Sequence, residues 1–242
     1  MNKFLFGFIL FLGSVFATES FAGVIDQQCP QFTVVGTPQY QPHPGDQEIC
    51  HMNYAVIHRC EVKAPVAVFE HLTVAELTGS AKRKDNFHPD TSVAPQCSAT
   101  LADYATVGKT HDRGHMAPAG NNTLNDAIMS ESFNLSNMVA QNSNNNRGGW
   151  KQIETFERQW AMQPGTDFYI ISGGIFDQEH PFTGNGLGIP TRLYKIIIEK
   201  NSKKVQAYLF PNAPISVADV LKYQVPMVTI EEATGMKFNL GQ

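Results

Sequence analysis

One short segment of the chain gathers the side chains that phosphate-ester hydrolysis needs. Residues 112–115 read Asp-Arg-Gly-His, so an acceptor, a permanent cation and a titratable base lie within four positions. Arginine presents a planar fork of donors that fits phosphate oxygens, and histidine can remove a proton near neutral pH. Gly114 permits a backbone shape that a side chain would obstruct. The segment predicts His115 as a general base and Arg113 as a phosphate clamp.

A second polar segment begins 31 residues after His115 and supplies an amide oxygen at Asn146 and a carboxylate at Glu154. An amide oxygen is a hard ligand of the kind that Mg²⁺ prefers while it keeps several waters. On a helix, Glu154 lies two turns beyond Asn146 and about 80° around the axis. We therefore expect Glu154 to accept a hydrogen bond from metal-bound water, with Asn146 as the metal ligand. The neighbouring Asn144 and Asn145 leave a one-residue shift of this assignment open.

The two segments together resemble the DNA/RNA non-specific endonuclease family. The resemblance covers roughly residues 50–240 and rests on Asp112–His115, on Leu135-Ser136-Asn137, and on the pattern Asn146…Gly148…Trp150…Glu154. It implies a metal-dependent hydrolase that cuts DNA and RNA with little sequence preference. It assigns the general base to His115 and implies Mg²⁺ as the cofactor, for which Mn²⁺ can substitute. It also places Asn137 beside the site, where the side chain can position water or phosphate.

Three further roles follow from the surroundings of these segments. Asp112 is expected to orient neighbouring groups or the backbone of the tetrapeptide. Arg158 can reach a phosphate, and it can also pair with Glu154, since the two are four residues apart on a helix. Arg83 lies in an upstream stretch where some family members carry another phosphate-contacting arginine, but the register is ambiguous and Arg83 is left out of the assignment.

The remaining pattern predicts an α+β fold. Strand-like composition occurs at residues 53–59, 65–72, 168–172, 193–199 and 205–210, with a hairpin turn at Asn201-Ser202. An amphipathic stripe predicts a helix from Trp150 to Trp160, and shorter helices are expected at residues 216–223 and 229–234, the last capped by Thr229. The resemblance implies a central antiparallel sheet flanked by helices, with a ββα-metal active site on a hairpin-and-helix element.

Residues 1–22 differ in composition from the rest of the chain. Lys3 precedes an almost unbroken apolar run, and Ser20-Phe21-Ala22 offers small residues at a cleavage site. This pattern is typical of a secretory signal peptide and predicts a secreted or periplasmic protein. The run is too short to span a bilayer comfortably, and no later segment does better. We expect residues 23–242 to form a single nuclease domain, with an irregular arm over about residues 23–50.

Cysteine usage and charge limit the possible functions. An even count of cysteines in an exported chain suggests two disulfides, with three pairings open among Cys29, Cys50, Cys60 and Cys97. The net charge of −4 argues against a protein that coats nucleic acid through bulk charge. Local basic clusters nevertheless lie near the two polar segments, at residues 82–84, 109–113 and 147–158.

Other functions are weighed against this prediction. A phosphodiesterase acting on small nucleotides would use the same groups, and plasmid nicking separates it from an endonuclease. An inactive nucleic-acid-binding relative is disfavoured because His115, Asn146 and Glu154 are all present. A zinc pair of His111 and His115 lacks a third soft ligand, and Gly114 lowers the helix propensity between them.

Overall fold

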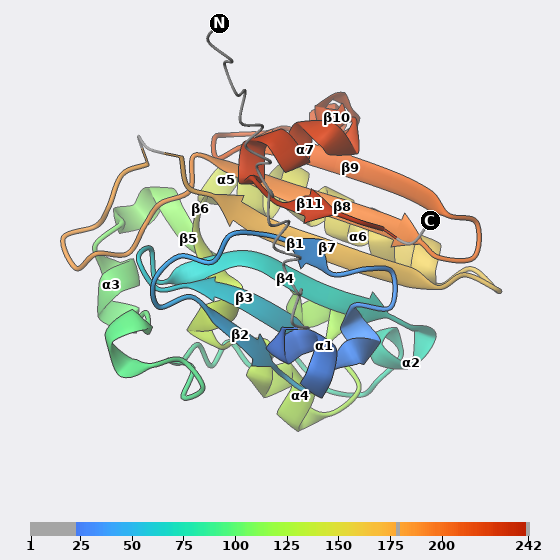
Figure 1. The fold of residues 1–242 in the computed structure, drawn as a ribbon, viewed down its shortest axis with the longest axis horizontal. Helices are drawn as coiled ribbons and strands as arrows, with labels where there is room; N and C mark the ends of the chain where they lie inside the picture. The colour runs from blue at the N-terminus through green and yellow to red at the C-terminus, as the bar shows by residue number, and fades with distance from the viewer. Residues whose placement is uncertain (1–22, 178–179, 241–242) are drawn as a thin grey trace, which may run out of the picture.

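A single antiparallel sheet organises the computed structural model, which describes residues 23–177 and 180–240. Seven strands form this sheet in the order β10-β9-β8-β7-β4-β3-β2 (Figure 1). The strands are β2 (Gln47–Cys50), β3 (Ala55–Arg59), β4 (Ala64–Leu72), β7 (Phe168–Ile175), β8 (Arg192–Glu199), β9 (Lys204–Pro211) and β10 (Gln224–Val225). The predicted signal segment, residues 1–22, lies outside the described residues. The predicted α+β fold with a central antiparallel sheet is confirmed.

Two small strand pairs and the helices surround the sheet. Strand β5 (His111–His115) pairs with β6 (Met138–Asn142), and β1 (Pro38–Gln39) pairs with β11 (Lys237–Phe238). The α-helices are α1 (Val24–Gln28), α2 (Val74–Leu77), α3 (Leu101–Ala105), α4 (Asp126–Glu131), α5 (Ser143–Asn145), α6 (Lys151–Ala161) and α7 (Met227–Thr234). None of these helices has both the length and the apolar character needed to cross a membrane, for the residues that the structure describes.

Both faces of the sheet are covered, which explains the nearly continuous apolar runs of its central strands. Helix α6 lies behind the sheet in Figure 1, while α1 and α7 lie in front of it. Trp150 and Ile153 at the start of α6 pack on alternate residues of the strands, and Ile25 and Ile230 pack on the intervening residues of the other face. Every residue of β7 is buried as a result. The apolar stripe of the predicted helix is confirmed, because Phe156 and Trp160 also pack against this core.

Some predicted elements differ from those observed. Helix α7 begins two residues before Thr229, after Pro226, so Thr229 lies inside the helix and does not cap it. Proline fits this place because it lacks the N–H that a helix start leaves unpaired. Residues 217–223 form a 3-10 helix. The expected irregular arm contains α1 and also β2, the edge strand of the sheet.

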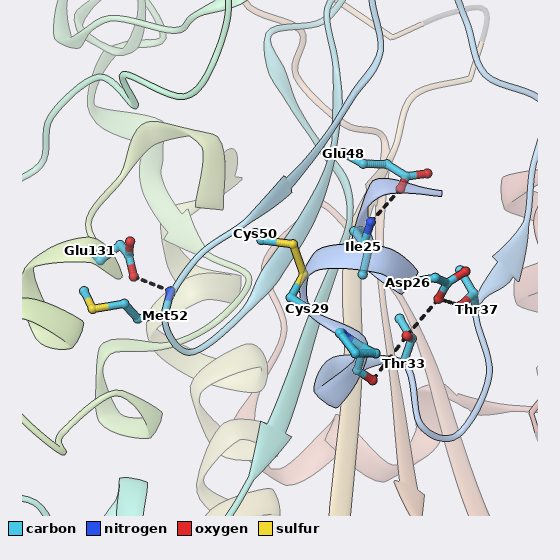
Figure 2. Close-up of a disulfide and its surroundings, with 10 residues drawn as sticks. Ile25, Asp26, Cys29, Thr33, Thr37, Glu48, Cys50, Met52 and Glu131 are labelled. Atoms are coloured by element: carbon cyan, nitrogen blue, oxygen red, sulfur yellow. Dashed lines mark hydrogen bonds between the residues drawn. A yellow bond between two sulfur atoms is a disulfide. The ribbon is translucent and has the colours of Figure 1, made fainter. Parts of the chain in front are cut away.

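Two disulfides fasten the N-terminal part of the chain and select one of the three pairings. Cys29 bonds to Cys50, joining α1 to β2 (Figure 2). Cys60 bonds to Cys97. Around the first bond, the Ile25 amide donates to Glu48 Oε2 at 3.0 Å (Figure 2). The prediction of two disulfides is confirmed, and none of the four cysteines is free to ligate a metal.

A buried histidine ties the turn after β2 to helix α4. His51 Nε2 lies 3.0 Å from Asp90 Oδ2, and Nδ1 lies 3.2 Å from Glu131 Oε1. The Met52 amide donates to the other oxygen of Glu131 at 2.7 Å (Figure 2). Burial opposes protonation of the imidazole, but the bonds to the two carboxylates outweigh it and raise the pKa of His51 to about 9. The charged imidazole therefore stabilises the folded chain.

Replacing His51 with alanine should lower the free energy of unfolding by about 3 kcal/mol, because two carboxylates lose a buried cation. The pKa is raised on folding, so the contribution is fully present below pH 6.5 and is lost as the pH rises through about 9. Urea unfolding of both proteins at the two ends of this range measures the difference. His43→Ala is the control, because that side chain is 46% exposed and its ion pair is worth little. A wild-type–mutant difference that does not shrink at high pH would contradict the assignment.

Candidate active site

Strands β5 and β6 form the hairpin that carries the predicted tetrapeptide. Gly114 pairs with Val139, and the side chain of the nearby Gln141 crosses the glycine. A Cβ atom at residue 114 would lie 2.0 Å from Gln141 Oε1. Glycine is thus required for space between the strands, and its backbone is not among those with positive φ. His115, the last residue of β5, pairs with Met138 on β6.

The helix after the hairpin begins with an irregular turn. Asn142 caps α5 by accepting hydrogen bonds from the amides of Asn144 and Asn145. Residues Asn146–Trp150 then form a π-helical turn in which Gly148 has φ −108° and ψ −105°, outside the helical region. Such π turns are frequent at functional sites. Trp150 Nε1 donates to the carbonyl of His115 at 3.1 Å and so joins the start of α6 to β5.

A cleft of about 650 Å³ lies between the hairpin and α6. Five of the seven predicted site residues line it: Arg113, His115, Asn146, Glu154 and Arg158. Further cations on the walls are Arg83, Arg147 and Lys151. The chain as a whole carries a net charge of −4, yet the groups around this cleft are mostly basic. The cleft is therefore suited to a polyanion, whose phosphates such groups neutralise.

His115 lies on the wall of the cleft against two phenylalanines. Its ring meets Phe133 edge-on at 5.0 Å and Phe87 at 5.6 Å between centroids. Burial, followed by the charges of Arg83 and Arg113, lowers the pKa of His115 to about 3. The ring is consequently neutral at neutral pH, and it is a weaker base than a free imidazole. This differs from the expectation of an ordinary pKa near neutrality, and the physical reason is desolvation.

Asp112 orients the amide of Asn146. Asn146 Nδ2 donates to Asp112 Oδ2 at 2.8 Å, and Arg147 donates to both carboxylate oxygens. Burial raises the pKa of Asp112, but the hydrogen bonds from Arg147, Asn146 and Ser143 outweigh it and lower the pKa below the usual value. No hydrogen bond within the described residues ends on Asn146 Oδ1. The amide nitrogen is thus committed to Asp112, and the oxygen remains available to a cation.

The neighbouring asparagines are placed differently. The side chain of Asn145 is buried, and its Nδ2 donates to the Pro211 carbonyl at 2.9 Å. Asn144 is exposed and does not line the cleft. Of the three, only Asn146 faces the cleft beside His115, which supports the register chosen from the sequence.

The groups around Asn146 fit a hard divalent cation that is held mostly by water and substrate. No cluster of three or more His, Cys, Asp or Glu side chains in residues 23–177 and 180–240 could hold a metal by itself. An amide oxygen in a cleft that the carboxylate of Glu154 also lines suits Mg²⁺, which keeps several of its waters. A site of this kind leaves open positions for phosphate oxygens.

Glu154 and Arg158 lie on successive turns of α6 but do not pair with each other. Burial, with a contribution from Glu157, raises the pKa of Glu154 to about 7 in spite of the opposing charge of Lys195. Arg158 instead donates to Asn121 Oδ1 at 3.2 Å and to Thr155 Oγ1 at 3.4 Å. The i,i+4 ion pair that their spacing suggested is absent from the described contacts.

The structure corrects the role expected for Asn137. Its side chain is fully buried, and it neither lines the cleft nor faces water. The amide donates to the carbonyls of Ala117 and Ser132 and accepts from the Ala117 amide, each at 2.8 Å. These three bonds occupy both amide hydrogens and one lone pair of the oxygen, and burial keeps water and phosphate away from the rest of the group. Asn137 fixes the chain that leaves β5 just after His115.

Arg83 belongs to the cleft, although the sequence left it unassigned. Its guanidinium carbon lies 5.1 Å from the centre of the Phe133 ring, and its Nε donates to Asp85 at 2.7 Å. Arg113 stacks in the same manner on Phe87, at 4.2 Å. The signals in the sequence were the basic stretch at residues 82–84 and a family resemblance of ambiguous register, and a charge run cannot show which of its members faces the site.

Comparison with known proteins decides the family. The family model described as DNA/RNA non-specific endonuclease matches residues 35–242. The chain belongs to this family. Members named in the comparison include human mitochondrial Nuclease EXOG, which is 32% identical over 216 residues. The alignment covers 81% of this chain and 58% of the human protein.

Other members extend the likeness to the fold. Bovine mitochondrial Endonuclease G is 29% identical over 202 residues, covering 77% of this chain and 67% of its own length. A chain in the crystal structure of the EndoG/EndoGI complex matches with a TM-score of 0.75 and 27% identity. That match covers 86% of this chain and 90% of the other. The ββα arrangement expected at the site is therefore shared with a solved nuclease of the family.

The family comparison also corrects the expected location. Nuclease EXOG and Endonuclease G are mitochondrial, which contradicts the secreted or periplasmic location inferred from residues 1–22. That inference rested on one lysine, an apolar run and a small-residue cleavage site at Ser20-Phe21-Ala22. Such a run shows that a segment can enter an apolar environment, and it does not by itself specify the compartment.

Replacing Asp112 with alanine should weaken metal binding in this family member by about 10- to 100-fold, because the partner that orients a ligand is lost. Asn146 would then be free to turn its amide. The apparent affinity for Mg²⁺, taken from a titration of cleavage rate, measures the effect. Asp85→Ala is the matched control, since that carboxylate pairs with Arg83 at the surface. Equal metal affinities for Asp112→Ala and wild type would show that Asn146 needs no such partner.

Proposed function

We propose that this protein is a Mg²⁺-dependent endonuclease that hydrolyses phosphodiester bonds of DNA and RNA with little sequence preference. Membership of the family supports nuclease activity on nucleic acid. The observation that carries the proposal is the cleft, which brings His115, Asn146 and Glu154 together with Arg113 and Arg158. These residues supply a base, a metal ligand, an acceptor for bound water and two phosphate-binding cations.

Each residue of the cleft would have a separate role in phosphodiester hydrolysis. His115 accepts a proton from the attacking water, since its ring is neutral and lies on the cleft wall. Arg113 and Arg158 hold phosphate oxygens through their planar donors. Asn146 would hold the cation, and Asp112 keeps the amide oxygen turned towards it. When bound, Mg²⁺ supplies stabilisation of the negative charge on the phosphate and on the leaving oxygen.

The extent of the cleft favours a polymer over a small nucleotide. A second hollow of about 500 Å³ adjoins it and shares four of its residues, namely Arg83, Arg113, Asn146 and Arg147. The second hollow continues past Tyr104 and His111. Space is thus available on both sides of the proposed metal ligand, as an internal phosphodiester requires. Contacts made to phosphates carry no base information, which accounts for low sequence preference.

Cleavage assays on three substrates test the proposal. The protein is incubated with supercoiled plasmid, with RNA and with a small phosphodiester, in Mg²⁺, in Mn²⁺ and in EDTA. We expect nicking of the plasmid and degradation of RNA in either metal, none in EDTA, and much slower turnover of the small ester. Turnover of the small ester alone would favour the phosphodiesterase alternative, and no metal-dependent turnover at all would favour an inactive binding protein.

The acid limb of the pH profile should be set by Glu154. Its carboxylate must be charged to accept a hydrogen bond from bound water, so activity should fall as the pH drops through about 7. His115, with a pKa of about 3, stays neutral throughout this range. Rates measured across this range for wild type and Glu154→Gln check the assignment, because the variant has no titrating group there. A fall in activity near pH 7 that persists in Glu154→Gln would show that another residue titrates there.

A further inference from the structure

Beneath the cleft lies a buried polar cluster that the proposed chemistry does not use. Glu70 on β4 and Lys195 on β8 point from the sheet towards α6, at positions where apolar residues would be expected. Glu157 on α6 completes the cluster, with its Oε2 at 3.0 Å from Lys195 Nζ. All three side chains are almost fully buried. Buried charges are costly unless they are paired, so their retention here needs a reason.

Asn121 joins this cluster to the cleft. The residue is fully buried in the turn that follows β5. Its Nδ2 donates to Glu157 Oε1 at 3.0 Å and to Glu70 Oε1 at 3.3 Å, and its Oδ1 accepts from Arg158 Nη1 at 3.2 Å. An amide can donate to two carboxylates and accept from an arginine at the same time, which neither an aspartate nor an aliphatic side chain can do. The amide thus has a fixed orientation.

The guanidinium of Arg158 contacts Asn121 on one side and lies against the backbone of Gly120 on the other. A Cβ atom at Gly120 would lie 3.2 Å from Arg158 Nη1, so the guanidinium passes close over the backbone of residue 120. Two of the five N–H donors of Arg158 are used by Asn121 and Thr155. The others remain for an anion in the cleft that Arg158 lines. The sheet, α6 and the turn after β5 therefore meet at one cationic side chain.

We propose that Asn121 is a positioning residue that holds the guanidinium of Arg158 for a nucleic-acid phosphate, with Glu70, Glu157 and Lys195 as its buried support. The inference rests on the proposed function, in which Arg158 binds phosphate. The support works because Asn121 cannot rotate without removing the hydrogen-bond donor from Oε1 of both Glu70 and Glu157. Burial and the charge of Glu157 raise the pKa of Glu70 well above its usual value, which favours the neutral form of Glu70 beside the Glu157–Lys195 ion pair.

A double-mutant cycle on binding tests the inference. Binding of a short fluorescent single-stranded DNA is measured in EDTA over a range of salt concentrations, so that no cleavage occurs. Arg158→Ala should weaken binding by about tenfold, as loss of one charged hydrogen-bonding group does. It should also reduce the slope of log Kd against log salt by about 0.7. Asn121→Ala should reproduce most of both changes, and the double variant should bind as Arg158→Ala alone does.

Two further variants separate positioning from general stability. Asn122 is also fully buried, donates to the Pro118 carbonyl and accepts from Asn53, but has no contact with Arg158. Asn122→Ala should destabilise the protein comparably and leave the salt slope unchanged. Gly120 is exposed, so Gly120→Ala should fold even if Asn121→Ala does not. In the wild-type background, the added methyl group should displace the guanidinium and weaken DNA binding. In the Arg158→Ala background, Gly120→Ala should leave DNA binding unchanged.

Several results would overturn the inference. They are full additivity of the Asn121 and Arg158 effects, an unchanged salt slope in Asn121→Ala, or normal binding by both Arg158→Ala and Gly120→Ala. The proposed function fails differently, because it requires metal-dependent cleavage by the wild-type protein. Coupled binding without cleavage would keep Asn121 as a positioning residue and refute the endonuclease. Metal-dependent cleavage with additive effects of the Asn121 and Arg158 variants on binding would support the endonuclease and refute the positioning role of Asn121.

Discussion

Replacing His115 with alanine should leave a folded protein that has lost nearly all cleavage of plasmid and RNA. Loss of a general base typically lowers the rate by about 10²- to 10⁴-fold. The ring is the neutral imidazole of the cleft, which Arg113 and Glu154 also line. The substitution removes the ring contacts with Phe87 and Phe133 and leaves the backbone pairing of β5 with β6 in place, so thermal unfolding should remain cooperative.

The decisive measurement is the cleavage rate of each folded variant at saturating Mg²⁺. His71→Ala is the matched control, because that imidazole pairs with Asp167 and stacks on Tyr169, away from the cleft. Its activity should equal that of wild type. His111→Ala should cost much less than His115→Ala, since His111 lies outside the tetrapeptide and borders only the adjoining hollow. Near-normal cleavage by His115→Ala would remove the general base from the mechanism.

Features that depend on residues close in the chain could be predicted from the sequence. The strands β3, β4, β7, β8 and β9 and the helix α6 follow from local patterns of apolar residues. The tetrapeptide and the Asn146–Glu154 segment were joined to one site by the family resemblance, since strands β5 and β6 were not among the predicted elements. The spacing to Trp150 and Glu154 favoured Asn146 over Asn144 and Asn145 and left a shift along the asparagine run open.

What the sequence could not provide depends on contacts between distant segments. Asn137 and Asn146 are the same residue type, and only the fold shows that the first is used up by main-chain bonds while the second keeps a free oxygen. Lys195 stands in an apolar strand, where nothing local reveals that Glu157 neutralises it across the sheet–helix interface. The lowered pKa of His115 arises in the same way, from burial and from two arginines, of which Arg83 is remote in the sequence. Polar residues that act through tertiary contacts do not recur at regular spacings in the sequence, so no sequence pattern predicts them.

Replacing Asn146 with alanine should lower cleavage by roughly 10³-fold at moderate Mg²⁺, because stabilisation by a bound metal is worth several kcal/mol and each 1.4 kcal/mol is a factor of ten. The variant removes the one side-chain oxygen that Asp112 turns towards the cleft. Part of the activity should return at high Mg²⁺ or Mn²⁺, since water can replace the missing ligand. A titration of rate against metal concentration measures both the loss and its recovery.

The neighbouring asparagines give matched controls for the metal ligand. Asn144→Ala should behave as wild type, because the side chain is exposed and lies outside the cleft. Asn145→Ala loses the bond to the Pro211 carbonyl, so it should unfold at a lower temperature while its dependence on metal concentration stays unchanged. Only the Asn146 variant should shift the metal titration, because Asn146 alone of the three lines the cleft, whereas the side chain of Asn145 is buried. A shift of the titration in Asn144→Ala or Asn145→Ala, with none in Asn146→Ala, would move the metal ligand by one or two residues along the same turn.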